Sequence, residues 1–138
     1  MGEYPVVLNH GDMIPSNILV DEETWTITGL VDWAEAEYLP FGTCLYGLES
    51  LLGYLDQTST PEFVYYDDTE RWREVFWSHL LNTLPALRKR RRDIEVMRDL
   101  GVLLWYGIAW DDGALDRVVS EEDDAEVLAC LRAFLDVT

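Results

Sequence analysis

The feature that most constrains this chain is the order of polar residues between short apolar runs near its start. An apolar run at residues 6–8 leads to the tripeptide HGD at residues 10–12, and Asn17 follows the aspartate by five positions. A second apolar run, a polar turn and a third run then lead to Asp32. Short runs rich in β-branched residues and broken by polar turns are typical of strands. We therefore predict a strand, a loop and a β-hairpin within residues 6–33.

The predicted hairpin pairs residues 18–20 with residues 26–31. A hairpin brings its two ends together, so Asn17 and Asp32 are expected side by side, near Asp12 on the preceding loop. Magnesium prefers hard oxygen ligands and keeps several waters. Asp32 can supply a carboxylate and Asn17 a carbonyl oxygen, while Asp12 can accept a proton from an attacking hydroxyl or orient it. The same three side chains could instead hold the loop and hairpin together through turn hydrogen bonds.

The remainder of the chain, residues 41–138, predicts a helical bundle. Pro40 and Gly42 break the chain before it. Apolar residues at helical spacing predict four helices. The first spans the leucines at 45–55, and the second spans residues 72–80 and ends before Pro85. The third spans residues 94–108, and its wide apolar face predicts a central position. The last starts at Ser120 and buries Leu128, Leu131, Phe134 and Leu135. The fold class expected is α+β and mostly α, a single domain over residues 1–138 with the hairpin unit packed on about four helices.

Composition excludes several classes of function. The formal net charge is −17, and phosphate backbones require a basic surface, so nucleic acid is not an expected partner. No apolar run approaches the roughly 20 residues of a membrane span. Cys44 and Cys130 have no metal-ligand spacing and are expected as packed thiols. We expect a cytoplasmic protein without nucleic-acid or membrane partners.

The motifs resemble the aminoglycoside phosphotransferase and choline kinase-like family, a branch of the protein-kinase-like fold. The string HGDMIPSN at residues 10–17 is similar to the catalytic loop of that family, and GLVDW at residues 29–33 is similar to its metal-binding segment. The run DWAEAEYLPFG at residues 32–42 resembles, more narrowly, family members found in fungal genomes. The motif match extends over roughly residues 6–55 and places them in the C-terminal lobe of such a kinase.

The resemblance implies roles for these residues. It implies that Asp12 is the catalytic aspartate, that Asn17 and Asp32 bind magnesium, and that His10 braces the loop. His10 could otherwise act as a base. In a family that phosphorylates aminoglycosides or choline, acidic residues close to the site are candidates for binding a cationic substrate. Glu35 and Glu37, which follow the metal-binding segment, are such residues, and Trp33 beside them is a further candidate. The alternative for the two glutamates is an exposed acidic turn.

The sequence also departs from the family pattern. Members carry an N-terminal lobe with a phosphate-covering loop and a strand lysine, whereas only five residues precede the first strand here. The single lysine, Lys89, lies in the basic cluster of residues 88–92, which could be a solvated helix start, a nuclear address or a phosphate-binding patch. Positioning and charge neutralisation supply most of the catalysis in phosphoryl transfer. ATP-dependent activity of this chain by itself is therefore not expected.

Three hypotheses for function remain open. The first is a magnesium-dependent phosphotransferase acting on a small-molecule hydroxyl, with a partner protein supplying the missing lobe. The second is a nucleotide-independent enzyme that uses the same acidic residues for acid–base chemistry on a small molecule, and the third is a non-catalytic binding or regulatory module. Apolar residues around Val6, Ile14 and Trp33 should lie on the surface that would meet the lobe. Because a bare apolar surface favours self-association, we expect a homodimer.

Overall fold

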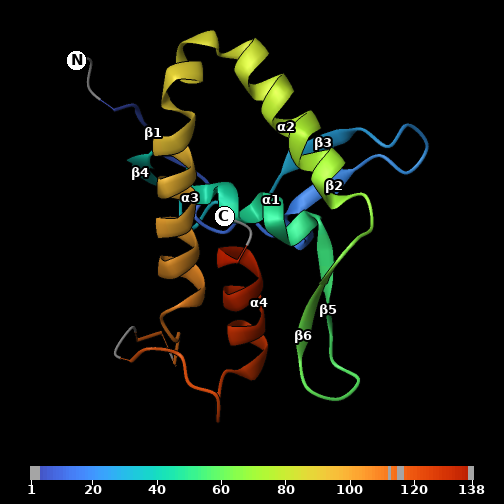
Figure 1. Ribbon diagram of the computed structural model, residues 1–138, viewed down its shortest axis with the longest axis vertical. Helices are drawn as coiled ribbons and strands as arrows, with labels where there is room; N and C mark the ends of the chain where they lie inside the picture. The colour runs from blue at the N-terminus through green and yellow to red at the C-terminus, as the bar shows by residue number, and fades with distance from the viewer. Residues whose placement is uncertain (1–3, 112, 115–116, 137–138) are drawn as a thin grey trace.

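The computed structural model describes residues 4–111, 113–114 and 117–136. This part of the chain forms four α-helices and three antiparallel two-stranded sheets, which confirms the predicted α+β class (Figure 1). The strands are β1 (Val6–Asn9), β2 (Ile18–Val20), β3 (Ile27–Leu30), β4 (Glu37–Pro40), β5 (Gly53–Asp56) and β6 (Glu62–Tyr65). The α-helices are α1 (Tyr46–Leu51), α2 (Thr69–Thr83), α3 (Arg91–Tyr106) and α4 (Ala125–Leu135), and the 3₁₀ helices are η1 (Pro15–Asn17), η2 (Thr43–Leu45) and η3 (Pro85–Arg90).

The hairpin of β2 and β3 follows the predicted pairing closely. Ile18 lies opposite Leu30, and the register shifts after Leu19 so that Val20 faces Ile27. The second strand starts at Ile27, later than expected, because Trp25 has a left-handed backbone conformation with a φ of 55°. The hairpin projects from the body of the molecule, with its polar turn at the tip (Figure 1).

The strand at residues 6–9 has a partner that the sequence did not predict. β1 pairs antiparallel with β4, so that Val7 faces Leu39 and Asn9 faces Glu37. From the sequence, the segment before Pro40 is predicted only as a connection, with a break in the chain at Pro40 and Gly42. Pro40 fits in this sheet because it lies at the end of a two-stranded pair, where a missing backbone donor is tolerated.

The first expected helix is much shorter than residues 45–55. α1 ends at Leu51, and Gly53 begins strand β5, which pairs with β6 through Gly53 opposite Tyr65. A Cβ atom at Gly53 would lie 2.3 Å from the carbonyl oxygen of Val64, so glycine permits this close strand contact. Leucine spacing did not separate a helix from a strand here, because short apolar runs fit both patterns.

The other helices also differ from the prediction in which residues they bury. On α2, Trp72 is 48% exposed, while Arg73 and Trp77 are buried. The prediction that the third helix is central is wrong for one of its faces, since Leu100 and Leu104 are 40% and 51% exposed. Helical spacing identified the helices, but the direction each one faces is decided by packing.

The last helix begins at Ala125 rather than at Ser120. The Ser120 hydroxyl accepts a hydrogen bond from the backbone N–H of Asp123, and the Asp124 carboxylate accepts one from the Ser120 N–H. These bonds close a turn that precedes α4. The prediction that Ser120 caps the last helix is therefore wrong, because its hydroxyl closes the preceding turn instead. Of the expected stripe, Phe134 is fully buried and Leu128, Leu131 and Leu135 are half-buried.

The core consists of two apolar clusters. One joins Tyr46, Val102 and Phe134, and the other joins Trp77, Leu87 and Ile94. Both cysteines are free and half-buried, in agreement with the prediction of packed thiols. In the part of the chain that the structure describes, no helix is long and apolar enough to cross a membrane.

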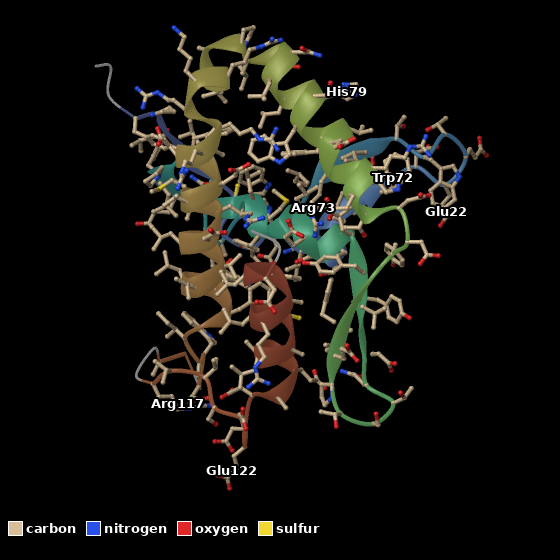
Figure 2. The ribbon with its side chains drawn as sticks, in the orientation of Figure 1. Glu22, Trp72, Arg73, His79, Arg117 and Glu122 are labelled. Carbon is tan, nitrogen blue, oxygen red and sulfur yellow. The ribbon has the colours of Figure 1, made fainter. Side chains whose placement is uncertain are left out.

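A group of charged side chains lies within the helical part. Glu49 of α1 is 1% exposed and pairs with Arg73 of α2 at 2.7 Å and with Arg98 of α3 at 3.3 Å. Figure 2 shows Arg73 on α2, and His79 further along the same helix on its exposed side. The hydroxyl of Tyr65 on β6 donates to the same carboxylate at 3.1 Å. Four elements are therefore connected through one buried glutamate.

Candidate functional site

The loop between β1 and η1 is braced by a buried histidine. His10 is 2% exposed, its Nε2 donates to the carbonyl oxygen of Val31 at 2.8 Å, and its Nδ1 accepts the backbone N–H of Asp12 at 3.3 Å. The ring also lies 4.5 Å from the Trp33 ring, centre to centre. With both ring nitrogens used in this way, His10 joins the loop to the end of the hairpin.

Asp12 and Asn17 are brought together as the sequence predicted. The side-chain amide nitrogen of Asn17 donates to Oδ2 of Asp12 at 2.8 Å and to its backbone carbonyl oxygen at 2.9 Å. The other carboxylate oxygen of Asp12, Oδ1, is buried and has no hydrogen-bond partner among the described residues. A buried carboxylate oxygen without a donor is unfavourable, because the water that solvated it has not been replaced. This oxygen therefore lacks the donor that a buried acceptor normally has.

Asp32 lies immediately after the point where the hairpin is tied to the loop. The backbone N–H of Val31 donates to the carbonyl oxygen of Asn17 at 3.0 Å, and the Val31 carbonyl accepts the bond from His10. Asp32 itself has a φ of 62°, which is uncommon for a residue other than glycine. Its side chain is exposed. The two ends of the hairpin thus meet as predicted.

The backbone of Gly11 packs closely against the segment that follows Asp32. Gly11 has a φ of 86°, and a Cβ atom there would lie 2.1 Å from the carbonyl oxygen of Glu35. The side chains of Glu35 and Glu37 are exposed, and Trp33 is 46% exposed with its indole N–H donating to the carbonyl oxygen of Leu30. The three residues predicted to contact substrate therefore follow the loop closely along the chain and present exposed side chains.

One residue that supports the loop was not predicted from the sequence. The Tyr46 hydroxyl donates to the carbonyl oxygen of Gly11 at 2.9 Å and accepts the backbone N–H of Met13 at 3.2 Å. Burial raises the pKa of Tyr46 well above its ordinary value, so the hydroxyl keeps the proton that it donates. The tyrosine lies at the start of α1, more than 30 residues after the loop, and its only signal was an aromatic residue beside an apolar run.

A small hollow lies behind the loop. Its volume is about 90 Å³, and Asn9, Gly11, Tyr46 and Leu104 are among the residues that line it. Asn9 is 2% exposed and its amide nitrogen donates to the carbonyl oxygens on both strands of the sheet, at Val7 and Leu39. A larger cleft, of about 530 Å³, lies elsewhere, between α1, α2 and α3. The hollow beside the loop is too small for a substrate and belongs to the packing of the loop.

The loop residues fit a magnesium ion in their chemistry. Because the amide nitrogen of Asn17 is used by Asp12, its carbonyl oxygen is the atom left to face a cation. With the exposed carboxylate of Asp32, the donor set is entirely oxygen, as magnesium prefers. Among the described residues, no group of three or more His, Cys, Asp or Glu side chains is placed to hold a metal. The candidate metal ligands are instead one asparagine and one aspartate, Asn17 and Asp32.

Comparison with known proteins identifies a family match at the start of the chain. Residues 2–43 match the sequence model of a phosphotransferase enzyme family. The matched segment contains β1, the loop, the β2–β3 hairpin and β4, and it ends where η2 begins. No curated protein matches the chain, and no solved structure does. The match therefore covers the segment that carries the candidate site and does not extend into the helical part.

Proposed function

We propose that residues 9–33 form the acceptor and metal side of a site for magnesium-dependent phosphoryl transfer to a hydroxyl group of a small molecule. The observation that carries the proposal is the arrangement around the carboxylate of Asp12, a half-buried residue. One of its oxygens is held by Asn17, and the other has no partner among the described residues. A substrate hydroxyl that donates to this oxygen would satisfy it and would be oriented for attack. The family match over residues 2–43 supports the same class of reaction.

The other residues of the site then have separate roles. Asn17 and Asp32 would hold magnesium, which when bound neutralises charge on the phosphate groups. His10 positions the loop through its bonds to Val31 and Asp12, and no proton transfer is assigned to it. The exposed glutamates at 35 and 37 would contact a cationic group of the substrate.

The nucleotide side of the reaction would be held by groups outside this loop. The single lysine of the chain, Lys89, lies on η3, which contacts α2 and α3. Within residues 9–33 there is no arginine or lysine to neutralise the transferred phosphate. We therefore propose that full turnover requires a further protein segment, from a partner or from the same protein, that supplies a cation and covers the nucleotide.

Two variants separate the metal role from the base role. Binding of Mg²⁺ and of Mg·ATP is measured by calorimetry for the chain and for Asp32→Asn and Asp12→Asn, with the exposed Asp67→Asn as the matched control. Asp32→Asn removes a metal ligand and should weaken magnesium affinity at least tenfold. Loss of a residue that only supports a ligand already has an effect on the order of tenfold. Asp12→Asn should retain most metal affinity but lose about 10²–10⁴-fold in any transfer rate to hydroxyl substrates.

The outcomes discriminate between the remaining hypotheses. Metal binding that is absent in the parent chain, or unchanged in Asp32→Asn, would contradict the proposal and favour a binding module. Turnover of a hydroxyl compound without nucleotide would favour the repurposed enzyme. Transfer from ATP that depends on both aspartates would support the proposal directly.

A further inference from the structure

The feature that the proposed function leaves unexplained is what orients the tyrosine that supports the loop. Two aromatic rings of α3 lie against the Tyr46 ring. The Trp105 ring is stacked on it, with ring centres 5.2 Å apart and planes 11° from parallel. The Tyr106 ring meets it edge-on, with centres 6.1 Å apart and planes at 82°. Stacked and edge-to-face arrangements are the preferred geometries of aromatic pairs, so these two rings together fix the plane of Tyr46.

The orientation of Tyr46 decides where its hydroxyl lies. That hydroxyl bonds the backbone on both sides of Asp12, through the carbonyl oxygen of Gly11 at 2.9 Å and the N–H of Met13 at 3.2 Å. Because a tyrosine side chain has few rotatable bonds, a fixed ring plane also fixes the position of the hydroxyl. The backbone at Asp12 is therefore positioned, through the tyrosine, by the end of α3.

The two rings on α3 are held differently. Tyr106 is anchored in the core, because its hydroxyl lies 3.1 Å from the Ser50 hydroxyl and its ring packs edge-on against the fully buried Phe134 of α4. α4 lies beside the C-terminal half of α3 in Figure 1. Trp105 is 36% exposed, stacks on Tyr46 and also lines the small hollow behind the loop. Trp105 is thus the ring of the pair that can be changed with the smaller effect on the core.

We propose, given the function proposed for this loop, that Trp105 is a positioning residue of the site. Stacked on Tyr46, it holds the tyrosine hydroxyl where it bonds both neighbours of Asp12, and so keeps the Asp12 carboxylate beside Asn17. Trp105 acts through the tyrosine, and no contact with substrate or metal is assigned to it. The family match ends at residue 43. A residue of the helical part, outside the matched segment, therefore takes part in placing the loop within that segment.

Amide hydrogen exchange, followed by nuclear magnetic resonance, tests this role in the 138-residue chain. The reporter is the Met13 N–H, which donates to the Tyr46 hydroxyl. Trp105→Leu keeps an apolar side chain but removes the ring, and it should increase the exchange rate of this proton by about three- to tenfold, the equivalent of one aromatic pair. Trp105→Phe keeps a ring that can stack on Tyr46 and should restore most of the protection.

Two controls separate an effect on the loop from a general loss of stability. The N–H of Tyr66, which donates to the carbonyl oxygen of Leu52 at 3.0 Å, should change its exchange rate clearly less than Met13 does. Trp72→Leu removes a tryptophan of α2 that is 48% exposed, and it should leave the exchange of Met13 unchanged. Unchanged Met13 exchange in Trp105→Leu would overturn the proposal. Equal increases at Met13 and Tyr66 would also overturn it, because Trp105 would then only stabilise the fold.

Magnesium titration by calorimetry measures the consequence for the site. In a parent chain that binds Mg²⁺, Trp105→Leu should weaken the affinity by about three- to tenfold, and Trp105→Phe should restore most of it. Faster Met13 exchange with unchanged magnesium affinity would overturn the positioning role. A parent chain that binds no Mg²⁺ would contradict the proposed function instead, and the exchange of Met13 would still decide whether Trp105 holds the loop.

Discussion

Two carboxylates in this protein have opposite environments: Glu49 is buried, whereas Asp12 is half-buried. Glu49 receives hydrogen bonds on both oxygens, from Arg73, Arg98 and Tyr65. Asp12 receives a side-chain bond on one oxygen only, from a neutral amide, and its other oxygen has no partner among the described residues. A carboxylate that is fully paired can do little besides stabilise the fold. The difference indicates that the helical part is held by charge pairing, whereas the loop leaves one carboxylate oxygen without a partner among the described residues.

The largest effect on stability is expected from breaking the saturated cluster. Glu49→Ala leaves Arg73 and Arg98 buried without their shared carboxylate, and removing one partner of a buried ion pair lowers stability by about 3–5 kcal/mol. The control is Glu70→Ala, which removes the exposed second partner of Arg73 and should lower it by less than about 1 kcal/mol. Urea denaturation measures both. Equal effects would show that burial does not distinguish the two glutamates.

A glycine substitution tests how closely the loop is packed. Gly11→Ala places a methyl group against the backbone of Glu35 in a left-handed conformation, and strain plus overpacking should lower stability by about 2–4 kcal/mol. Gly113 has a similar φ of 83°, but a methyl group added there would meet no atom within 4 Å, so Gly113→Ala isolates the conformational part at about 1–2 kcal/mol. If thermal and urea unfolding show no difference between the two variants, the contact of Gly11 with Glu35 is not close in solution.

The tyrosine that supports the loop should have a moderate effect. Tyr46→Phe keeps the ring stacked on Trp105 but removes the hydroxyl that bonds Gly11 and Met13, which should lower stability by about 1–2 kcal/mol. Magnesium affinity should fall as well, because the loop loses its tie to α1. Tyr4→Phe, which loses a hydroxyl that donates to the carbonyl oxygen of Phe41, is the control that leaves metal affinity unchanged. A loss of metal affinity in both variants would contradict a specific role for Tyr46.

The smallest effect on stability is expected at the unsaturated carboxylate. Asp12→Asn removes a charge from a half-buried side chain, where it is only partly compensated, and keeps an oxygen for Asn17, so the free energy of unfolding should change by less than about 1 kcal/mol. The comparison is Glu49→Gln, which removes a fully paired charge and should destabilise clearly more. Denaturation measures both. A large loss in Asp12→Asn would show that Asp12 stabilises the loop as Glu49 stabilises the helices, and the distinction between them would fail.

The sequence predicted the loop and hairpin accurately because their information is local. The spacing from Asp12 to Asn17 and the β-branched runs on either side of a polar turn are enough to bring Asn17 next to the end of the hairpin. The prediction failed at residues 45–55, where leucine spacing is compatible with a helix or a strand, and the pairing of β5 with β6 decided the outcome. It also failed for the burial of Trp72 and Leu100, because spacing defines a helical face without saying what covers it.

The sequence by itself therefore determined the order of the candidate site: a bracing histidine, an aspartate, an asparagine and a second aspartate on a loop and hairpin. The tertiary structure decided which groups hold that site and which surface remains open. Tyr46 reaches Gly11 across 35 positions, and Arg98 reaches Glu49 across 49. Such partners are chosen by the packing of helices against each other, which no local pattern of residues encodes. The same packing leaves Leu100 of α3 40% exposed.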